Sequence, residues 1–105
     1  MLDLSSLTYD KDGLIPVIVQ NDQSNEVLML GYSTQELLKE SLEIGRVVFF
    51  SRSRNARWLK GETSGNYLEL VSLQTDCDSD AVLARVKPHG PTCHLGSSSC
   101  FCEDK

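Results

Sequence analysis

Residues 75–83 read TDCDSDAVL and place three aspartates around one cysteine. Asp76, Asp78 and Asp80 repel one another unless a cation lies among them. In a fully extended strand Asp76 and Asp80 would lie roughly 13 Å apart, too far to share one ion. The segment therefore either curls, so that its carboxylates converge on a hard cation such as Mg²⁺, or forms only the polar end of a strand. A calcium-binding EF-hand loop is excluded, because its sixth position would be Ala81 rather than Gly.

The cysteines form a second set of candidate metal ligands: Cys77, Cys93, Cys100 and Cys102. Their spacing contains no CxxC, which excludes zinc-ribbon and thioredoxin-like motifs. The segment GPTCHLGSSSCFC is rich in Gly and Ser, so its backbone can wrap around an ion. Three thiolates and an open position would form a catalytic zinc site, four would form a closed structural site, and buried thiols without a metal are the third alternative.

A basic, hydroxyl-rich segment, SRSRNARWLKGETSGN at residues 51–66, is a candidate anion site. Its cationic side chains, hydroxyls and glycine amides are the groups that bind phosphate oxygens. It contains no GxxxxGK[ST] or GxGxxG motif, so the alternative is a solvated basic loop.

The two histidines are the remaining candidates. His94, directly after Cys93, is either a proton carrier or a structural hydrogen-bonding residue, and His89 is expected to be a loop residue without a special role.

Length and composition restrict the class of protein. The chain has 105 residues, of which 40% are hydrophobic, and this suits one domain with one core. No apolar run approaches the roughly 20 residues that span a bilayer. The net charge of −5 argues against nucleic-acid binding. The N-terminus lacks the order of a secretory signal, so we expect a cytoplasmic protein whose cysteines are metal ligands or catalytic groups rather than disulfides.

The elements that position these residues are predicted to be mainly strands. Apolar, β-branched or alternating segments predict strands at about 15–21, 26–32, 46–53, 67–74 and 81–87, the first two paired as a hairpin. Everything after Pro88 is predicted to be a long loop.

One helix is predicted over residues 34–44. Ser33 and Glu36 have the spacing of a capping box, and Gly45 ends the helix. Its apolar side is formed by Leu37, Leu38, Leu42 and Ile44. The predicted fold class is α+β, mainly antiparallel β with one α-helix and a long C-terminal metal-binding loop, and a core this small would benefit from dimerisation.

The segments GLIPVIVQ, EVLMLGY, FFSRSRNARWLKGETSGN, DCDSDA and GPTCHLGSSSCF occur in this order. Together they resemble the phosphoribosyl-AMP cyclohydrolase family, which acts in the third step of histidine biosynthesis. The resemblance extends from about residue 13 to residue 101. It implies one cyclohydrolase domain over residues 1–105 and an interwoven homodimer.

The same resemblance implies two metal ions per subunit. Zinc is expected on Cys77, Cys93 and Cys100, with ligands contributed across the dimer, and magnesium on Asp76, Asp78 and Asp80. Cys102 departs from the family pattern. We expect that it is not a ligand, because a fourth thiolate would close the open position of the zinc.

The implied reaction is hydrolytic opening of the N1–C6 bond of the adenine ring of 1-(5-phosphoribosyl)-AMP, which yields the phosphoribosylformimino-AICAR phosphate intermediate. Zinc would activate the attacking water, and His94 and Glu62 are the candidate catalytic residues. Glu62 could instead anchor its loop, and Trp58 could stack on a base or fill the core. The expected substrate-binding residues are Arg52, Trp58, Lys60, Thr63 and Ser64.

The implied partner is a phosphoribosyl-ATP pyrophosphohydrolase, either fused to the chain or separate. The competing hypothesis is a binding module without catalysis, in which Cys102 completes a structural zinc site. A deaminase of the cytidine type is a further alternative that the sequence disfavours, because the chain has neither H-x-E nor PCxxC.

Overall fold

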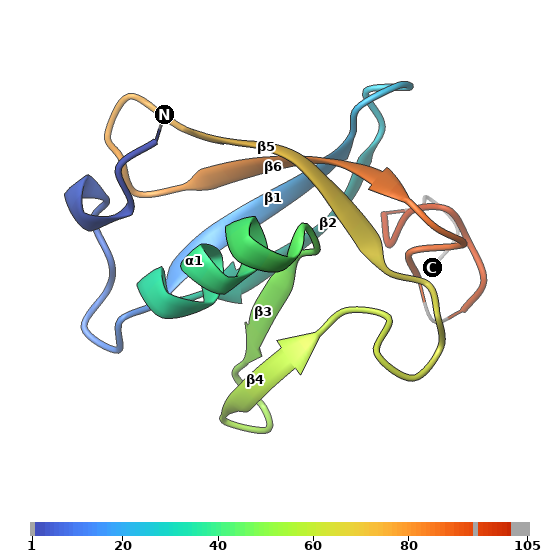
Figure 1. Cartoon of the computed structure of the whole chain (residues 1–105), viewed down its shortest axis with the longest axis horizontal. Helices are drawn as coiled ribbons and strands as arrows, with labels where there is room; N and C mark the ends of the chain where they lie inside the picture. Colours follow the sequence, from blue (N-terminus) through green and yellow to red (C-terminus); the bar gives the residue numbers. More distant parts are fainter. Residues whose placement is uncertain (1, 94, 102–105) are drawn as a thin grey trace.

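The computed structural model describes residues 2–93 and 95–101 of the chain. Its elements are, in chain order, the short 3-10 helix η1 (Leu4–Ser6), β1 (Ile15–Asn21), β2 (Val27–Ser33), α1 (Gln35–Ile44), β3 (Val48–Ser51), β4 (Ala56–Leu59), β5 (Leu68–Thr75) and β6 (Val82–Pro88) (Figure 1). No helix in this described part has the length and apolar character that a bilayer crossing requires.

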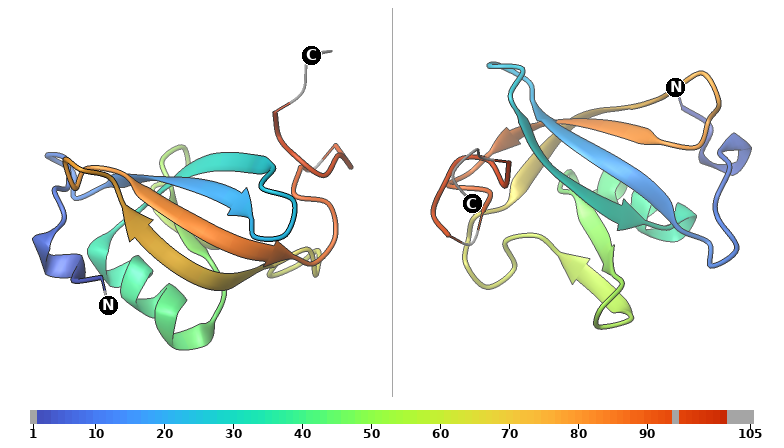
Figure 2. Two further views of the ribbon diagram at one scale, coloured as in Figure 1. Left: turned by 90° about the horizontal axis from the view of Figure 1, so that it is seen from above. Right: turned by 180° about the vertical axis from the view of Figure 1, so that it is seen from behind.

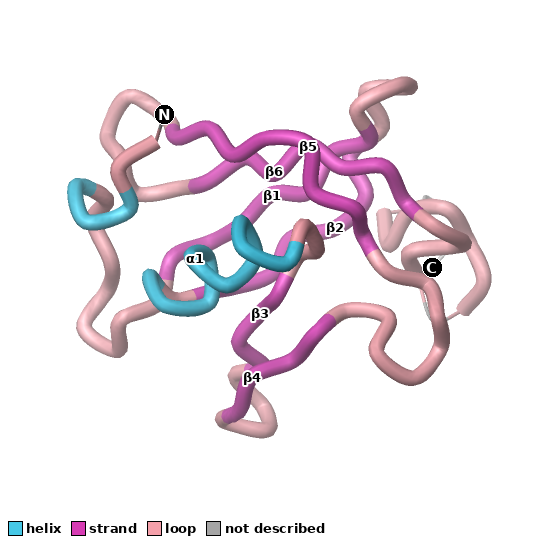
Figure 3. Tube along the Cα trace, in the orientation of Figure 1, coloured by secondary structure: helices cyan, strands magenta, loops and turns pink. Residues whose placement is uncertain are grey.

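Four strands form one sheet in the order β2-β1-β6-β5, and β3 with β4 forms a separate two-stranded ribbon (Figure 3). The pairs β1–β2, β3–β4 and β5–β6 are antiparallel, while the central pair β1–β6 is parallel. The prediction of a mainly antiparallel β protein with one α-helix is confirmed. The parallel pair was not predicted, because it joins two strands that are far apart in the sequence.

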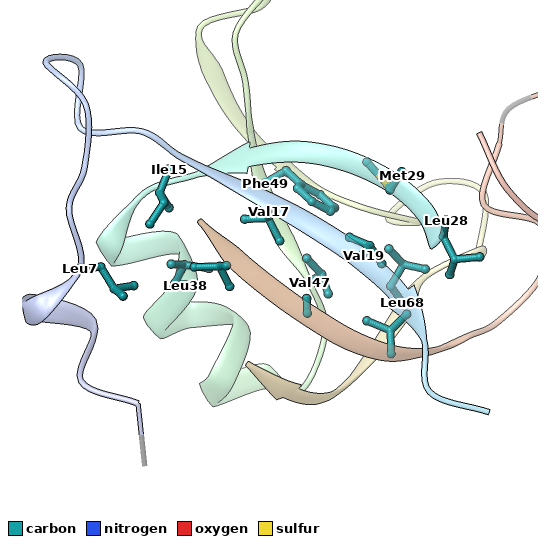
Figure 4. Close-up of a cluster of buried hydrophobic side chains, with 13 residues drawn as sticks. Leu7, Ile15, Val17, Val19, Leu28, Met29, Leu38, Val47, Phe49 and Leu68 are labelled. Atoms are coloured by element: carbon teal, nitrogen blue, oxygen red, sulfur yellow. The ribbon is translucent and has the colours of Figure 1, made fainter. Parts of the chain in front are cut away.

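The core lies between the sheet and helix α1, which packs on one side of the sheet (Figure 2). Buried residues alternate along the central strands, as in Ile15, Val17 and Val19 of β1 (Figure 4). Close packing also fixes Gly31 of β2, since a Cβ atom there would lie 2.7 Å from Cδ1 of Phe49. The position therefore excludes any residue with a side chain unless Phe49 moves.

Alternation places a second row of apolar side chains on the opposite face of the sheet. Leu30, Ile18 and Leu83 are cross-strand neighbours on β2, β1 and β6. Leu30 is 47% exposed, and this is a large exposed fraction for a leucine in the middle of a strand. The chain therefore presents apolar surface at the centre of this face.

Helix α1 begins one residue later than the capping-box spacing predicts. Thr34 is the N-cap, and its hydroxyl accepts a hydrogen bond from the Leu37 N–H at 3.1 Å. Ser33 instead belongs to β2, where its buried hydroxyl donates to the Val48 carbonyl at 3.0 Å. The tertiary hydrogen bond to β3 therefore outweighs the local capping pattern. Gly45 ends the helix as predicted, with a left-handed φ of 74°.

The predicted apolar side of α1 is only partly buried. Leu38 is 1% exposed, but Leu42 and Ile44 are 46% and 45% exposed. The helix contacts the core through Leu38 and Ser41, and its end is held at the edge strand β5, where the Gly45 carbonyl accepts a hydrogen bond from the Leu70 N–H at 2.9 Å.

Candidate metal and anion sites

The three aspartates converge in the turn between β5 and β6. Ligand oxygens of Asp76, Asp78 and Asp80 all lie within 4.8 Å of one another. The chain curls because Oδ1 of Asp76 accepts hydrogen bonds from the N–H groups of Asp80 at 3.0 Å and Ala81 at 3.3 Å, while Ser79 adopts a left-handed φ of 59°. Of the two sequence-based alternatives, the structure has the convergent one, and these exposed oxygens match the ligands that hard divalent cations prefer.

The two outer carboxyls of this turn have opposed pKa shifts. Desolvation raises the pKa of Asp76, but hydrogen bonds from Asp80 and from backbone N–H groups outweigh it, so the pKa lies below its ordinary value. The hydrogen bond with Asp76 and its negative charge raise the pKa of Asp80, and the charge of Asp78 adds to this effect. The turn therefore concentrates negative charge that a bound cation would neutralise.

Neighbouring segments hold the Asp76–Asp80 turn in place. The Thr8 N–H donates to the Ser79 carbonyl at 2.7 Å, and Oγ1 of Thr75 donates to the Ala81 carbonyl at 2.9 Å. The N-terminal segment and the end of β5 thus fix the turn from two sides, so the carboxylates are brought together by the fold and not only by their own hydrogen bonds.

The predicted thiol ligands lie at two ends of the molecule. Cys77 is exposed in the turn before β6, whereas Cys93 is buried and Cys100 half-buried in the C-terminal loop that follows β6 (Figure 1). Among the described residues, only the three aspartates form a group close enough to share a metal ion. Within one chain, the structure therefore does not bring Cys77 to the other two thiols.

The described part of the C-terminal loop is attached to strand β2. The Cys100 N–H donates to the Leu28 carbonyl at 2.7 Å, and Oγ of Ser99 donates to the Val27 carbonyl at 2.7 Å. Cys100 also packs against the hydrophobic core. These contacts fix the far end of the loop, so Cys100 lies on a supported segment.

A cavity of about 680 Å³ opens between the β4–β5 loop and the C-terminal loop. Its wall contains Cys93 and most of the substrate-binding and acid–base residues expected from the sequence: Trp58, Lys60, Glu62, Thr63 and Ser64. The volume is in the range of small-molecule sites. Arg54, Asn66 and Thr92 also line it and were not singled out from the sequence, although Arg54 belongs to the basic segment that signalled an anion site.

Arg52 lies outside this cavity. Its guanidinium stacks on the ring of Tyr32, 3.8 Å from the ring centre, and it lines a separate hollow with Asn55.

Trp58 both packs against the core and faces the cavity, so it combines the two roles that the sequence left open. Its ring lies 5.6 Å from that of the buried Phe49, yet the side chain is 37% exposed and lines the cavity.

His89 has contacts that the sequence did not suggest. Its ring stacks on Tyr67 with 4.2 Å between ring centres, and its Nε2 lies 3.0 Å from Oε1 of Glu69. Arg46 covers Tyr67 at 3.8 Å from the ring centre. This stack fixes the start of the C-terminal loop. Two other candidates, His94 and Cys102, lie outside the described residues.

Comparison with known proteins adds a family match. The model of a family described as phosphoribosyl-AMP cyclohydrolase matches residues 29–102. Three similar proteins are each named histidine biosynthesis bifunctional protein HisIE. That of Escherichia coli (strain K12) is 59% identical over 96 residues, which are 90% of this chain and 47% of that protein. That of Xanthomonas axonopodis is 54% identical over 99 residues (93% and 48%), and that of Thermus thermophilus 52% over 100 residues (95% and 47%). The chain thus spans about half the length of the curated relatives it matches.

Proposed function

The chain belongs to the phosphoribosyl-AMP cyclohydrolase family, and on this premise we propose that it hydrolyses the N1–C6 bond of the adenine ring of 1-(5-phosphoribosyl)-AMP in histidine biosynthesis. The product is the phosphoribosylformimino-AICAR phosphate intermediate. One observation carries the proposal: a single cavity joins the cation Lys60, the carboxyl Glu62 and the candidate metal ligand Cys93. Opening an adenine ring that carries two ribose phosphates needs these three kinds of group together.

The donor sets fit two different metals. Cys77, Cys93 and Cys100 supply soft thiolate ligands of the kind that zinc takes, and a set of three leaves one position open. Asp76, Asp78 and Asp80 supply converging hard oxygens of the kind that magnesium takes. We infer one ion of each kind per subunit.

The zinc site is proposed to form between two subunits. Cys77 lies beyond one end of β6 and Cys93 beyond the other, so one chain cannot close a site from both without refolding. The apolar row on the sheet face opposite the core supports a homodimer, since Leu30 is 47% exposed beside its cross-strand neighbours Ile18 and Leu83. We propose a two-fold dimer in which the Asp76–Asp80 turn of each subunit lies against the cavity of the other, since contacts across a two-fold axis are reciprocal.

The proposed reaction needs a nucleophile, a proton carrier and groups that bind the substrate's phosphates. A bound zinc ion supplies the Lewis acidity that makes water a nucleophile near neutral pH. Water adds to C6, the N1–C6 bond breaks, and the former amino group becomes a carboxamide. His94, next to Cys93 in the sequence, is the proposed proton carrier, and Glu62 in the cavity wall is the second acid–base candidate.

Substrate binding is assigned to the wall of the cavity. Lys60, Thr63 and Ser64 offer an ammonium and two hydroxyls to phosphate, and the partly exposed Trp58 offers its ring for stacking on a base. Arg52 contacts the substrate in this proposal only where a phosphate extends towards the β3–β4 turn. Arg54 lines the cavity itself, so its guanidinium is better placed than that of Arg52 to bind a phosphate there.

We further propose that residues 1–105 act as one cyclohydrolase domain in the cytoplasm. The similar proteins are named bifunctional, which supports a second activity working beside this one. That activity is proposed to be the phosphoribosyl-ATP pyrophosphohydrolase, in a fused or a separate chain.

The test is an assay of ring opening. Phosphoribosyl-AMP is incubated with the protein, zinc and magnesium, and the change in purine absorbance is followed. We expect turnover that is lost in Cys93→Ser and retained in a control, Lys39→Met, at an exposed site on α1. A folded, metal-loaded wild-type protein that leaves the absorbance unchanged would refute the proposed activity.

A further inference from the structure

Lys60 connects the two walls of the cavity. It follows β4 directly, and its ammonium donates a 2.7 Å hydrogen bond to the carbonyl oxygen of Thr92 in the C-terminal loop. The two residues are 32 positions apart in the sequence. The contact is partly buried, and a charged donor makes it stronger than an ordinary surface hydrogen bond.

The acceptor belongs to the peptide group that leads into Cys93. The Thr92 carbonyl and the Cys93 N–H lie in one rigid plane. Lys60 holds the oxygen side of this plane, and the Ser97 carbonyl accepts from the Cys93 N–H at 3.1 Å on the other side. These two bonds restrain rotation of the plane, and the Cys93 carbonyl on the following peptide accepts from the Gly96 N–H at 2.9 Å. With the peptides on both sides of Cys93 held, the direction in which its side chain leaves the backbone is restrained.

The wall that carries Lys60 is itself tightly packed. Gly61 has a φ of 84°, and a Cβ atom there would lie 2.4 Å from the backbone nitrogen of Tyr67. The β4–β5 loop therefore folds back on the start of β5 next to Lys60. The Lys60 ammonium is therefore carried by a tightly packed segment, and its hydrogen bond can hold Thr92 of the C-terminal loop in place.

The environment of Thr92 shows that this wall is well enclosed. Thr92 is 2% exposed and Cys93 is 3% exposed. The Thr92 hydroxyl is buried without a hydrogen-bond partner in the described part of the chain. The side chain of Thr92 thus contributes no described hydrogen bond to the loop, whereas its backbone carbonyl does.

We propose that Lys60 is a positioning residue, which holds the peptide group before Cys93 and so presents the thiol for metal binding. The inference rests on the proposed function, in which Cys93 is a zinc ligand. It gives Lys60 a role beyond substrate binding, since one N–H of the ammonium is directed at Thr92. The ammonium also lies over the Trp58 ring, 5.5 Å from the ring centre.

The two roles of Lys60 make different predictions. A residue that only binds phosphate would affect KM and leave the metal site unchanged. A residue that positions Cys93 would affect the metal site in the absence of substrate. The decisive measurement is the rate of zinc release from the purified protein to a chromophoric chelator.

Four proteins are compared: wild type, Lys60→Met, Lys60→Arg and the control Lys39→Met. Loss of a group that orients a metal ligand typically lowers metal affinity about 10- to 100-fold, and we expect most of this loss to appear in the release rate, so Lys60→Met should release zinc about 10-fold faster or more. Lys60→Arg keeps a cationic donor and should recover most of the difference, while Lys39→Met should match the wild type. A wild-type release rate in Lys60→Met, with or without a raised KM, overturns the inference.

Two further measurements separate the possible failures. Alkylation of Cys93 by iodoacetamide, mapped by mass spectrometry, should be faster in Lys60→Met because the enclosing wall is released. If Lys60→Met does not fold, Lys60→Gln serves instead and should release zinc at an intermediate rate, with a wild-type rate again contradicting the inference.

If Cys93→Ser retains its zinc, the proposed metal centre is wrong. If Cys93→Ser loses zinc while the Lys60 variants behave as wild type, only the positioning role is wrong.

Discussion

Cys77 and Cys93 lie beyond opposite ends of strand β6, which separates them by seven strand residues. At about 3.3 Å per residue the strand alone spans roughly 20 Å, far more than the distance between two ligands of one metal ion. Strand β6 is paired on both sides, so it cannot bend to bring the two thiols together. A zinc site that uses both thiols therefore needs a second copy of the chain.

Mixing two inactive variants tests this shared site. Cys77→Ser and Cys93→Ser should each be inactive alone, because each lesion occurs in both sites of its homodimer. In a heterodimer one site carries both lesions and the other carries neither. Random pairing makes half of the dimers mixed, so co-refolding should restore about a quarter of wild-type activity. Heterodimers that form demonstrably and remain inactive would show that the zinc site lies within one chain.

Zinc analysis distinguishes a catalytic from a structural metal. We expect Cys93→Ser to lose zinc and activity together, and Cys102→Ser to keep both. A fourth thiolate would close the coordination sphere, and a structural zinc would then be weakened by the loss of Cys102. Zinc content by atomic absorption, measured beside activity, checks both variants. Loss of zinc from Cys102→Ser would favour the binding-module hypothesis.

Acid should weaken the contact between α1 and the β3–β4 ribbon. The carboxylate of Glu40 accepts hydrogen bonds from the Arg57 guanidinium, one of them at 2.9 Å from Nε. This contact lowers the pKa of Glu40 below its ordinary value of 4.5. The unfolded chain therefore takes up a proton at a higher pH than the folded chain. The stabilisation is complete above pH 4.5 and is lost as the pH falls through the lowered pKa.

The variant Glu40→Gln isolates this contribution. The pair is exposed, so the effect on Tm should be small, and the variant should lose less Tm than the wild type between neutral pH and pH 3. Glu43→Gln, at an exposed position one turn further along α1, is the matched control and should follow the wild-type curve. Identical curves for all three proteins would show that the ion pair does not contribute.

The sequence predicted the strands and the helix end that depend mainly on residues adjacent in the chain. Segments rich in β-branched residues gave β1 and β6, and the left-handed glycine at Gly45 gave the end of the helix. Strand β4 was missed because its residues, ARWL, lie within a polar segment and lack alternation. It pairs with β3, where Trp58 lies opposite Phe49 with their ring centres 5.6 Å apart, a contact that forms only in the folded chain.

The kinds of residue in the candidate site could be predicted from the sequence, but their positions relative to one another could not. The clustered aspartates left two alternatives open, a turn that converges on a cation or the polar end of a strand, and the structure has the turn, with the oxygens of Asp76 and Asp80 close together. Which arginine of the basic segment faces the cavity depends on the β3–β4 turn, so Arg52 was named where Arg54 lines the wall. The Lys60–Thr92 hydrogen bond joins two loops, and no spacing rule relates loops that meet only in the folded chain.

The aspartate turn yields the last prediction. Asp78→Asn removes one of three converging carboxylates, yet it leaves both Asp76 hydrogen bonds that shape the turn. The backbone should therefore keep its fold while the cation loses one charged ligand. We expect the magnesium concentration for half-maximal activity to rise about tenfold or more, the effect of losing roughly 1.4 kcal/mol of binding free energy, with zinc content unchanged. Asp12→Asn, an exposed aspartate outside the turn, is the control and should need no additional magnesium. An unchanged magnesium requirement in Asp78→Asn, with the variant folded and zinc-loaded, would mean that the three carboxylates do not bind the cation that activity requires.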